Sequence, residues 1–203
     1  MKIALIGASG QAGSRILAEL SARGHHVTAI ARDTSKIATL PGVTKAVGDA
    51  AEPEALAPLL AGHDAVISSI HFLASDVEKL LAAVKQAGVP RYLVVGGAGS
   101  LEGAPGQKIF DSPGFPAIYL AEAKAGGAFL ERLKQEAALD WTFLSPSAEF
   151  HPGERTGSFR LGTEQLLVSE AGRSHISFED YAVALANEIE APQHSRRRFT
   201  VGY

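Results

Sequence analysis

Three glycines, Gly7, Gly10 and Gly13, stand between a short apolar run (residues 2–7) and a stretch of helical periodicity. At such a turn the first glycine permits a tight bend, the second lets the backbone approach a ligand, and the third lets the helix pack closely. The helix that begins here offers free N–H groups and a partial positive charge to an anion. This strand–loop–helix setting predicts a loop that binds the pyrophosphate of a dinucleotide. The alternative is a glycine turn that serves packing alone.

Arg32 and Lys36 provide the second candidate chemistry. Arg32 lies 19 residues after Gly13, at the carboxyl end of the second expected strand (26–31), where the ribose of a dinucleotide lies in such folds. A guanidinium group can hold a 2′-phosphate through two hydrogen bonds, and Lys36 adds a point charge. We therefore expect NADP(H) to be preferred over NAD(H). The alternative is a pair of solvated cations with Asp33 as their partner.

Strand and helix patterns alternate along the chain. Strands are expected at residues 2–7, 26–31, 43–48, 64–70, 91–96, 141–145 and 198–203, helices at 11–23, from 53, at 75–88, near 119–138 and at 178–190, and a hairpin near 157–168. This alternation predicts an α/β fold with a single Rossmann-like, doubly wound, mostly parallel sheet and helices on both faces.

Local signals predict further details. Ser75 and Glu78 have the spacing of a capping box at a helix start. Tyr181 and Ala184 are expected to face the core from the last helix. The basic run at residues 196–198 is expected to be a solvated sheet edge that discourages pairing with another chain.

One domain is expected over residues 1–203, with segments from about 146 to 203 on the substrate side. Two stretches rich in Gly, Pro and Ser, residues 97–118 and 146–157, show no clear periodicity. Long irregular segments in a compact domain are usually functional or mobile. Both follow strands in the half of the sheet where a substrate would lie.

Composition excludes several classes of function. Apolar residues make up 46% of the 203-residue chain and charged residues 20%, the balance of a soluble globular domain. The formal net charge of −3 gives no broad attraction to nucleic acid or to an anionic membrane. The absence of cysteine excludes thiolate chemistry, and the seven histidines lack ligand spacing, so no metal is expected. No basic–apolar leader pattern precedes the first strand, and we expect a cytoplasmic protein.

Eight stretches together carry a family resemblance. They are GASGQAG, ARDTSK, GDA, AGHDAVISSI, VVGGAGSLE, WTFLSPSAEFHPGERTGSFRLG, SHISFEDYAVALANEIE and RRRFTVGY. In combination they resemble the atypical short-chain dehydrogenase/reductase proteins, in particular the NmrA-like NADH-flavin reductase group, which is akin to flavin/biliverdin-IXβ reductase. The resemblance covers nearly the whole chain, and its part after residue 92 is the more specific.

The resemblance implies a set of contacts for each part of the cofactor and for the substrate. Pyrophosphate contacts are implied for Gly7, Ser9, Gly10, Gln11 and Ala12, 2′-phosphate contacts for Arg32 and Lys36, adenine contacts for Asp49 and Ala50, and contacts on the ribose and nicotinamide side for Ser69, Ile70, Gly96, Gly97 and Pro146. The acceptor is expected to be bordered by His71, Ser147 and His151. For residues 48–50 a simple turn or helix cap is the alternative, and for the three acceptor-side residues it is hydrogen bonding within loops.

Three positions depart from the family pattern. Alcohol-oxidising relatives use a Tyr-x-x-x-Lys pair, in which the lysine lowers the tyrosine pKa, whereas Tyr119 and Lys124 are five residues apart. Gly97 replaces the serine that is common after the fifth strand, although Ser100 is close by. Ser147 stands where biliverdin-reducing relatives place a histidine. These departures argue against both alcohol oxidation and biliverdin reduction.

A reaction without a proton relay fits the remaining pattern. A flavin or quinone accepts hydride into a conjugated ring and takes its proton from water, so positioning is the main requirement. We therefore expect an NAD(P)H-dependent oxidoreductase, preferring NADPH, that reduces a flat small-molecule acceptor, and we assign no catalytic residue. The alternative is a non-catalytic NmrA-like sensor that binds NADP(H) and signals to a partner.

Overall fold

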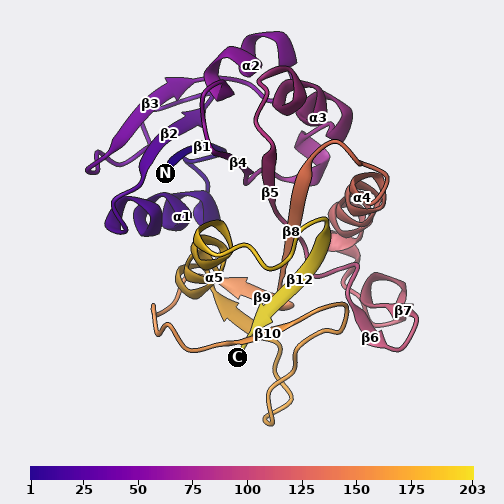
Figure 1. The fold of residues 1–203 in the computed structure, drawn as a ribbon. Coiled ribbons are helices and arrows are strands. Elements are labelled where there is room, and N and C mark those ends of the chain that lie inside the picture. Colours follow the sequence, from indigo (N-terminus) through magenta and orange to yellow (C-terminus); the bar gives the residue numbers. More distant parts are fainter.

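The computed structural model covers residues 1–203 and shows helices on both sides of a central sheet (Figure 1). The sheet has eight strands, in the spatial order β10 (Arg160–Gly162), β12 (Arg197–Gly202), β8 (Asp140–Pro146), β5 (Arg91–Val95), β4 (Ala65–Ser68), β1 (Lys2–Ile6), β2 (His26–Ala31) and β3 (Val43–Val47). Every neighbouring pair is parallel except β10 with β12. The Rossmann-like fold predicted from the sequence is confirmed.

Five α-helices form the two outer layers. They are α1 (Gln11–Ala22) and α5 (Phe178–Glu190) on one face, and α2 (Pro53–Leu60), α3 (Val77–Gln86) and α4 (Ala117–Leu133) on the other. Successive side chains of β1 point to opposite faces of the sheet. Ile3 and Leu5 therefore join the core cluster on one face, and Ala4 and Ile6 join the cluster on the other. None of these helices is both long and apolar enough to cross a bilayer.

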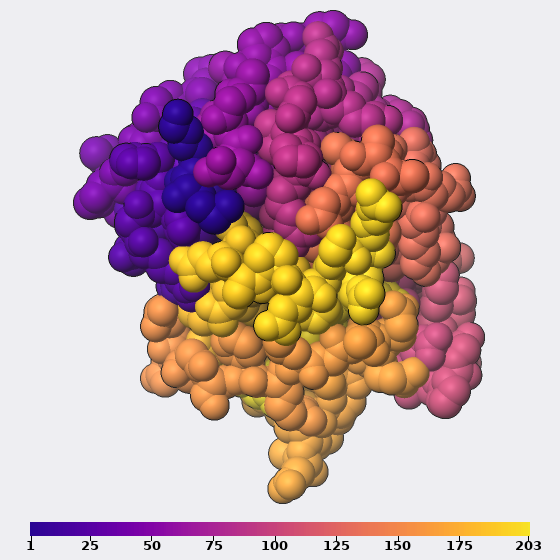
Figure 2. Space-filling model, in the orientation of Figure 1, coloured from indigo at the N-terminus to yellow at the C-terminus, as the bar shows by residue number.

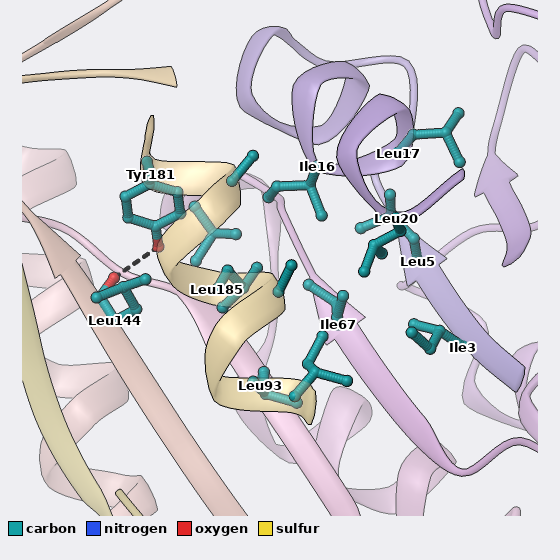
Figure 3. Packing of buried hydrophobic residues seen from close by; sticks show 14 of the residues in the cluster. Ile3, Leu5, Ile16, Leu17, Leu20, Ile67, Leu93, Leu144, Tyr181 and Leu185 are labelled. Atoms are coloured by element: carbon teal, nitrogen blue, oxygen red, sulfur yellow. Dashed lines mark hydrogen bonds between the residues drawn. The ribbon is translucent and has the colours of Figure 1, made fainter. Parts of the chain in front are cut away.

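Tyr181 links α5 to the carboxyl end of the sheet (Figure 3). Its ring is fully buried beside Leu185, and its hydroxyl donates to the carbonyl of Leu144 at 2.7 Å. Burial raises the pKa of Tyr181 far above its ordinary value, so the group stays a neutral donor. The core-facing orientation predicted for Tyr181 and Ala184 is confirmed, since both are buried in the same cluster.

The start of α3 differs from the prediction. Asp76, not Ser75, is the N-cap, and its carboxylate accepts from the backbone N–H groups of Glu78 and Lys79. Ser75 instead ends the short 3-10 helix η1 (Phe72–Ala74), where its hydroxyl donates to the carbonyl of Phe72. The Glu78 carboxylate does not return to the cap, because it pairs with Arg132 on α4.

The hairpin predicted near 157–168 is wrong. β10 pairs with the distant strand β12, and the chain after it turns toward the small hairpin of β6 (Glu102–Ala104) and β7 (Gln107–Lys108). There the N–H of Glu102 donates to the carbonyl of Glu164, and the N–H of Leu166 donates to the carbonyl of Glu102. A long-range strand partner therefore replaces the local one. The chain segment after β10, light orange in Figure 2, projects from the lower end of the molecule in that view.

The expectation of a solvated basic edge is wrong for Arg198. β12 lies inside the sheet between β8 and β10, and Arg198 is 5% exposed. Its guanidinium group donates to the Ser100 hydroxyl and pairs with Glu164. Arg196 and Arg197 are exposed at the opposite end of the strand from the carboxyl edge. β10 pairs with residues 200–202, and Glu164, which follows it in the chain, covers Arg198; no local signal in the sequence indicates this distant contact.

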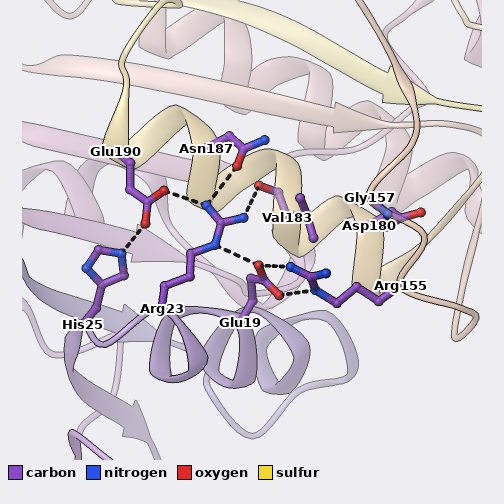
Figure 4. A network of polar contacts seen from close by, with 9 residues as sticks. All are labelled: Glu19, Arg23, His25, Arg155, Gly157, Asp180, Val183, Asn187 and Glu190. Carbon is purple, nitrogen blue, oxygen red and sulfur yellow. Dashed lines mark hydrogen bonds and ion pairs between the residues drawn. The ribbon is translucent and has the colours of Figure 1, made fainter.

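Residues 152–158 cross over α1 and α5 as a strap held by ion pairs and hydrogen bonds (Figure 4). Arg155 makes two hydrogen bonds, of 2.7 and 2.8 Å, to the buried carboxylate of Glu19, which Arg23 also contacts. The Arg155 guanidinium is the main cause that holds the pKa of Glu19 below its ordinary value. The strap directly follows β9 (Glu149–His151), which pairs with β11 (His175–Ser177), so it anchors this part of the chain to the helical layer.

Replacement of Arg155 by methionine should lower the free energy of unfolding by about 1 kcal/mol at about pH 7, because Glu19 loses its strongest partner. A carboxyl group whose folded pKa is depressed stabilises the fold above its unfolded pKa, and this stabilisation is lost as the pH falls through the folded value. The difference between variant and wild type should therefore shrink below the ordinary pKa of 4.5. Urea unfolding at about pH 7 and about pH 3.5 measures both quantities.

Arg173→Met is the matched control. Arg173 and Arg155 are equally exposed, but the partner of Arg173 is Glu149, which is 49% exposed, whereas Glu19 is 7% exposed. The control should leave the free energy of unfolding almost unchanged because surface pairs contribute little. Equal losses of unfolding free energy in the two variants would show that the burial of Glu19 does not strengthen its pairing with Arg155.

Candidate functional site

The N-terminus of α1 lies at the carboxyl edge of the sheet without internal neutralisation. Gly10 is the N-cap and makes no side-chain capping bond, and the first turn has no acidic residue. The backbone N–H groups of Gln11, Ala12 and Gly13 donate to no protein acceptor. Three free donors at the positive end of a helix form a site suited to an anion.

The three glycines of the preceding loop differ in what requires them. Gly7 has a φ of +83°, and a Cβ atom there would lie 2.1 Å from the carbonyl oxygen of Ser69. A Cβ atom on Gly13 would lie 2.2 Å from the carbonyl oxygen of Gly7, so this glycine packs against the loop itself. Gly10 would meet only the Gly7 oxygen, at 3.3 Å. The protein demands glycine at the first and third positions, and the second leaves bare backbone where a phosphate would approach.

A cavity of about 200 Å³ adjoins this loop. Its lining collects many of the residues proposed from the sequence for the cofactor, namely Gly7, Ser9, Gly10, Arg32, Asp49, Ala50, Ser69 and Ile70, together with His71. Gln11, Ala12 and Lys36 lie outside the lining. The residues come from the connections that follow β1, β2, β3 and β4, because parallel strands bring their carboxyl ends to one edge.

The cations at this edge have no partners within the protein. Arg32 and Lys36 make no hydrogen bond and no ion pair, although ten of the sixteen ion pairs involve an arginine. Asp33 accepts instead from Ser35, whose side chain is the largest cause of the lowered Asp33 pKa and whose N–H is the second, while the charge of Lys36 contributes less. Asp49 accepts from the N–H of Ala51, so one of its oxygens forms the turn that was the alternative for this residue.

A larger cavity of about 630 Å³ lies on the other side of residues 71 and 72. His71 lines the small cavity and Phe72 lines the large one. The other lining residues are Gly96, Gly97, Ala98, Gly99, Ser100, Ile109, Ser112, Gly114, Phe115, Pro116, Tyr119, Glu122, Ala123, Gly126, Pro146, Ser147, Ala148, Glu149 and Phe150. The predicted irregular segments therefore form much of its wall. Phe72, Phe115 and Tyr119 give it an aromatic lining.

Gly96, Gly97 and Gly99 form the floor of the large cavity, and other protein atoms pack closely beneath two of them. A Cβ atom on Gly96 would lie 2.4 Å from the ring of Phe143, and one on Gly99 would lie 2.5 Å from the Cβ of Ala123. A Cβ atom on Gly97 would meet only the ring of Phe72, at the ordinary distance of 3.6 Å. At Gly97, unlike Gly96 and Gly99, an added side chain would project into the cavity without a clash with protein atoms.

Glu122 connects the two cavities and was missed by sequence reasoning. Its carboxylate accepts from the N–H groups of Phe72 and Leu73, at 2.7 and 3.0 Å, and lies 3.4 Å from Nδ1 of His71. It therefore fixes the segment between the cavities. The only sequence signal was its place on α4 one turn after Tyr119, on the same helix face.

The three residues proposed for the acceptor lie in different surroundings. The His71 side chain is 88% exposed, at the rim of the small cavity. Ser147 is buried in the lining of the large cavity, and its hydroxyl donates to the carbonyl of Val201 at 3.0 Å. His151 is exposed, contacts the carbonyl of Pro152 and lines neither cavity. The structure thus brings Ser147 to the large cavity and leaves His151 outside it.

Tyr119 reaches the large cavity without a lysine beside it. Its side chain makes no hydrogen bond, and Ala123 occupies the position four residues later, which lines the cavity with it. Lys124 is absent from the lining. The helical spacing places Lys124 on another face of α4, as the sequence indicated.

Comparison with known proteins gives a consistent result over nearly the whole chain. A family model described as NAD(P)H-binding matches residues 7–192. The chain is similar to the uncharacterized protein YwnB of Bacillus subtilis (strain 168), with 41% identity over 211 residues that cover 99% of this chain and 98% of the relative.

Solved structures agree with this result. One is a protein of Streptococcus pneumoniae provisionally named an NADH-flavin reductase, with 36% identity, a TM-score of 0.87, and coverage of 100% of this chain and 99% of the other. Another is a protein of Bacteroides thetaiotaomicron provisionally named an epimerase, with 43% identity, a TM-score of 0.95, and coverage of 100% and 96%.

Gly97→Ala should leave the free energy of unfolding within about 0.5 kcal/mol of wild type, because its methyl group meets no protein atom closer than ordinary contact. The same methyl group narrows the cavity, so the Kd for NADPH, whose nicotinamide is expected at this floor, should rise several-fold. Nicotinamide fluorescence and thermal unfolding measure the two effects. The matched control Gly96→Ala, which overpacks Phe143, should lose about 1–3 kcal/mol of stability. Unchanged NADPH affinity in Gly97→Ala would place the nicotinamide elsewhere.

Proposed function

Because the chain belongs to the family of NAD(P)H-binding proteins, we propose that it is an NADPH-preferring reductase of a flat conjugated acceptor, such as a flavin or quinone. The observation that carries this proposal is the adjacency of two sites: an unneutralised helix N-terminus with free cations, and a large aromatic cavity without a paired proton relay. The name of the Streptococcus relative points to the same chemistry.

The small cavity would hold the adenosine and pyrophosphate part of the cofactor. The free N–H groups of α1 suit the pyrophosphate, and Arg32 with Lys36 suit the 2′-phosphate, since neither cation has a partner to give up. Asp49 and Ala50 would contact the adenine. Ser69 and Ile70 continue toward the large cavity, where Gly96, Gly97 and Pro146 would border the nicotinamide. When bound there, the cofactor supplies a hydride.

The large cavity would hold the acceptor. The rings of Phe72, Phe115 and Tyr119 can pack on a planar molecule, and the glycine floor lets such a ring lie close to the backbone. Of the proposed substrate-side segment from about 146 to 203, residues 146–150 line this cavity, which supports the proposal of one domain with its substrate side there. Positioning then carries most of the rate, because a conjugated ring needs no enzymic proton donor.

His71 and Ser147 are the proposed polar neighbours of the acceptor. His71 can reach over the rim between the cavities, and Ser147 lines the large one. His151 follows Phe150, which lines the large cavity, and would contact only an acceptor that extends beyond the rim. Each would act on acceptor affinity more than on hydride transfer, since none is placed as a proton relay.

A second candidate function is a non-catalytic sensor that binds NADP(H) and signals to a partner. The observation that favours it is Tyr119 without a lysine partner, since sugar or alcohol chemistry would need that pair. A sensor would bind NADP and NADPH with similar affinity and turn over no acceptor. Steady oxidation of NADPH by any ring acceptor removes this alternative.

Arg32→Glu tests the cofactor preference. A carboxylate beside the 2′-phosphate replaces attraction by repulsion, so the Kd for NADPH should rise by about 100-fold and that for NADH by less than about threefold. Fluorescence titration with each cofactor gives both values. Arg197→Glu is the matched control: it makes the same charge change at the opposite end of the sheet, also on an arginine without partners, and should alter neither Kd. Parallel losses for NADPH and NADH in Arg32→Glu would contradict the phosphate role.

A panel of acceptors tests the reaction itself. NADPH oxidation is followed with free FMN, menadione, biliverdin and small aldehydes, with NADPH saturation checked separately. We expect turnover of FMN or menadione and none of aldehydes, because the ring acceptors alone need no proton relay. Turnover of aldehydes without that of either ring acceptor would overturn the proposal and assign the proton transfer to Tyr119.

A further inference from the structure

Ser100 and Arg198 form a buried pair beneath the large cavity. Ser100 lines that cavity and is 4% exposed, and Arg198 lies behind it on β12 and is 5% exposed. Nη1 of Arg198 is 2.8 Å from the hydroxyl oxygen of Ser100. The two residues are 98 positions apart in the chain, so the pair exists only in the folded protein.

The chemistry of the pair fixes the direction of the hydrogen bond. A guanidinium group has donors and no acceptor, so the Ser100 oxygen must accept and its own proton must point elsewhere. That proton has no protein acceptor, because the contact with Arg198 is the one hydrogen bond of the Ser100 hydroxyl. Ser147 lines the same cavity in the opposite condition, since its proton is already donated to Val201.

The charge of Arg198 is only partly balanced. Glu164 pairs with one of its terminal nitrogens and is itself 46% exposed, so water screens it. The buried Nε of Arg198 has no partner. The Glu164 side chain is far more exposed than that of Arg198, so its carboxylate lies on the solvent side of the guanidinium. Positive potential therefore remains on the inner side, toward Ser100 and the cavity.

We propose, on the basis of the reductase function, that Ser100 donates a hydrogen bond to the acceptor atom on which negative charge gathers, and that Arg198 is the positioning residue that reserves the Ser100 proton for this use. Hydride transfer converts NADPH and the neutral ring to NADP⁺ and the ring monoanion, which then takes one proton from water. Ser100 donates to the carbonyl oxygen that carries this charge and keeps its own proton.

Ser100→Ala should lower kcat for menadione by about 10- to 100-fold and change KM by less than about threefold, because the bond strengthens as charge develops. Ser21→Ala is the matched control: it removes another buried hydroxyl, which donates to the carbonyl of Pro41 far from both cavities, and should leave kcat and KM unchanged. A Ser100→Ala enzyme with wild-type kcat, while wild type turns over menadione, would overturn the inference alone.

Arg198→Met tests the link between the pair. It should lower kcat by about 10-fold, and the double variant with Ser100→Ala should be no slower than Ser100→Ala, because both changes remove one interaction. Arg198→Lys keeps charge and donors, so it should restore kcat to within about threefold of wild type. Additive losses in the double variant would contradict the link. If the methionine variant does not fold, the lysine variant decides the question, and a folded lysine variant as slow as Ser100→Ala counts against it.

A binding measurement separates this inference from the proposed function. If wild type oxidises no NADPH with FMN or menadione, the reductase proposal fails by itself. The role of Ser100 is then read from quenching of FMN fluorescence by the NADP-saturated protein. Ser100→Ala should weaken FMN binding by about two- to threefold, in keeping with the small change in KM, and Ser21→Ala should leave it unchanged. Equal FMN affinity in all three proteins, or no FMN binding by wild type, would overturn the donor role as well.

Discussion

The carbonyl group of Leu144 joins the parts on which the candidate site depends. It accepts from the Tyr181 hydroxyl at 2.7 Å and from the N–H of Gly96 at 2.8 Å. One oxygen therefore ties the end of β8 to α5 on one face and to the end of β5 beside it. Because Gly96 also packs directly on Phe143, the floor of the large cavity cannot shift without moving the sheet. The floor of the site is therefore backbone held by the sheet, and the side chains of Phe72, Phe115 and Tyr119 form its aromatic wall.

The first half of the chain was predictable because its signals are local. Gly13 is required by contact with Gly7, six residues earlier, and Gly7 by its own positive φ as well as by the neighbouring Ser69 after β4. The expected strands 2–7 and 26–31 match β1 and β2 closely. Arg32 could be placed because a parallel sheet brings the end of β2 beside the loop after β1. The cofactor contacts themselves stay predictions, and what the fold confirms is that most of the residues proposed for them share one cavity.

The second half depends on partners that are remote in sequence. β10 was expected to pair locally but pairs with β12, about 40 residues later. Because the chain at β10 covers one side of β12, Arg198 on β12 is buried and not solvated. Glu122 carried no motif, because its role is to hold two backbone N–H groups of a segment 49 and 50 residues earlier. Ser75 and Asp76 both had cap chemistry, and the 3-10 turn before them decided between the two. In the first two cases a distant contact decided the outcome, and in the third the adjacent turn did.

The distribution of arginines shows how the protein separates structure from binding. Seven arginines pair with carboxylates, and two more donate to backbone carbonyls. Arg32 and Arg197 have no partner of either kind, so lack of a partner does not by itself mark a binding site. What distinguishes Arg32 is its place in a cavity beside the uncapped start of α1, where two positive features without internal neutralisation lie together. In a fold that pairs most of its arginines with carboxylates, this edge keeps a positive charge, and an anion supplied from solution would neutralise it.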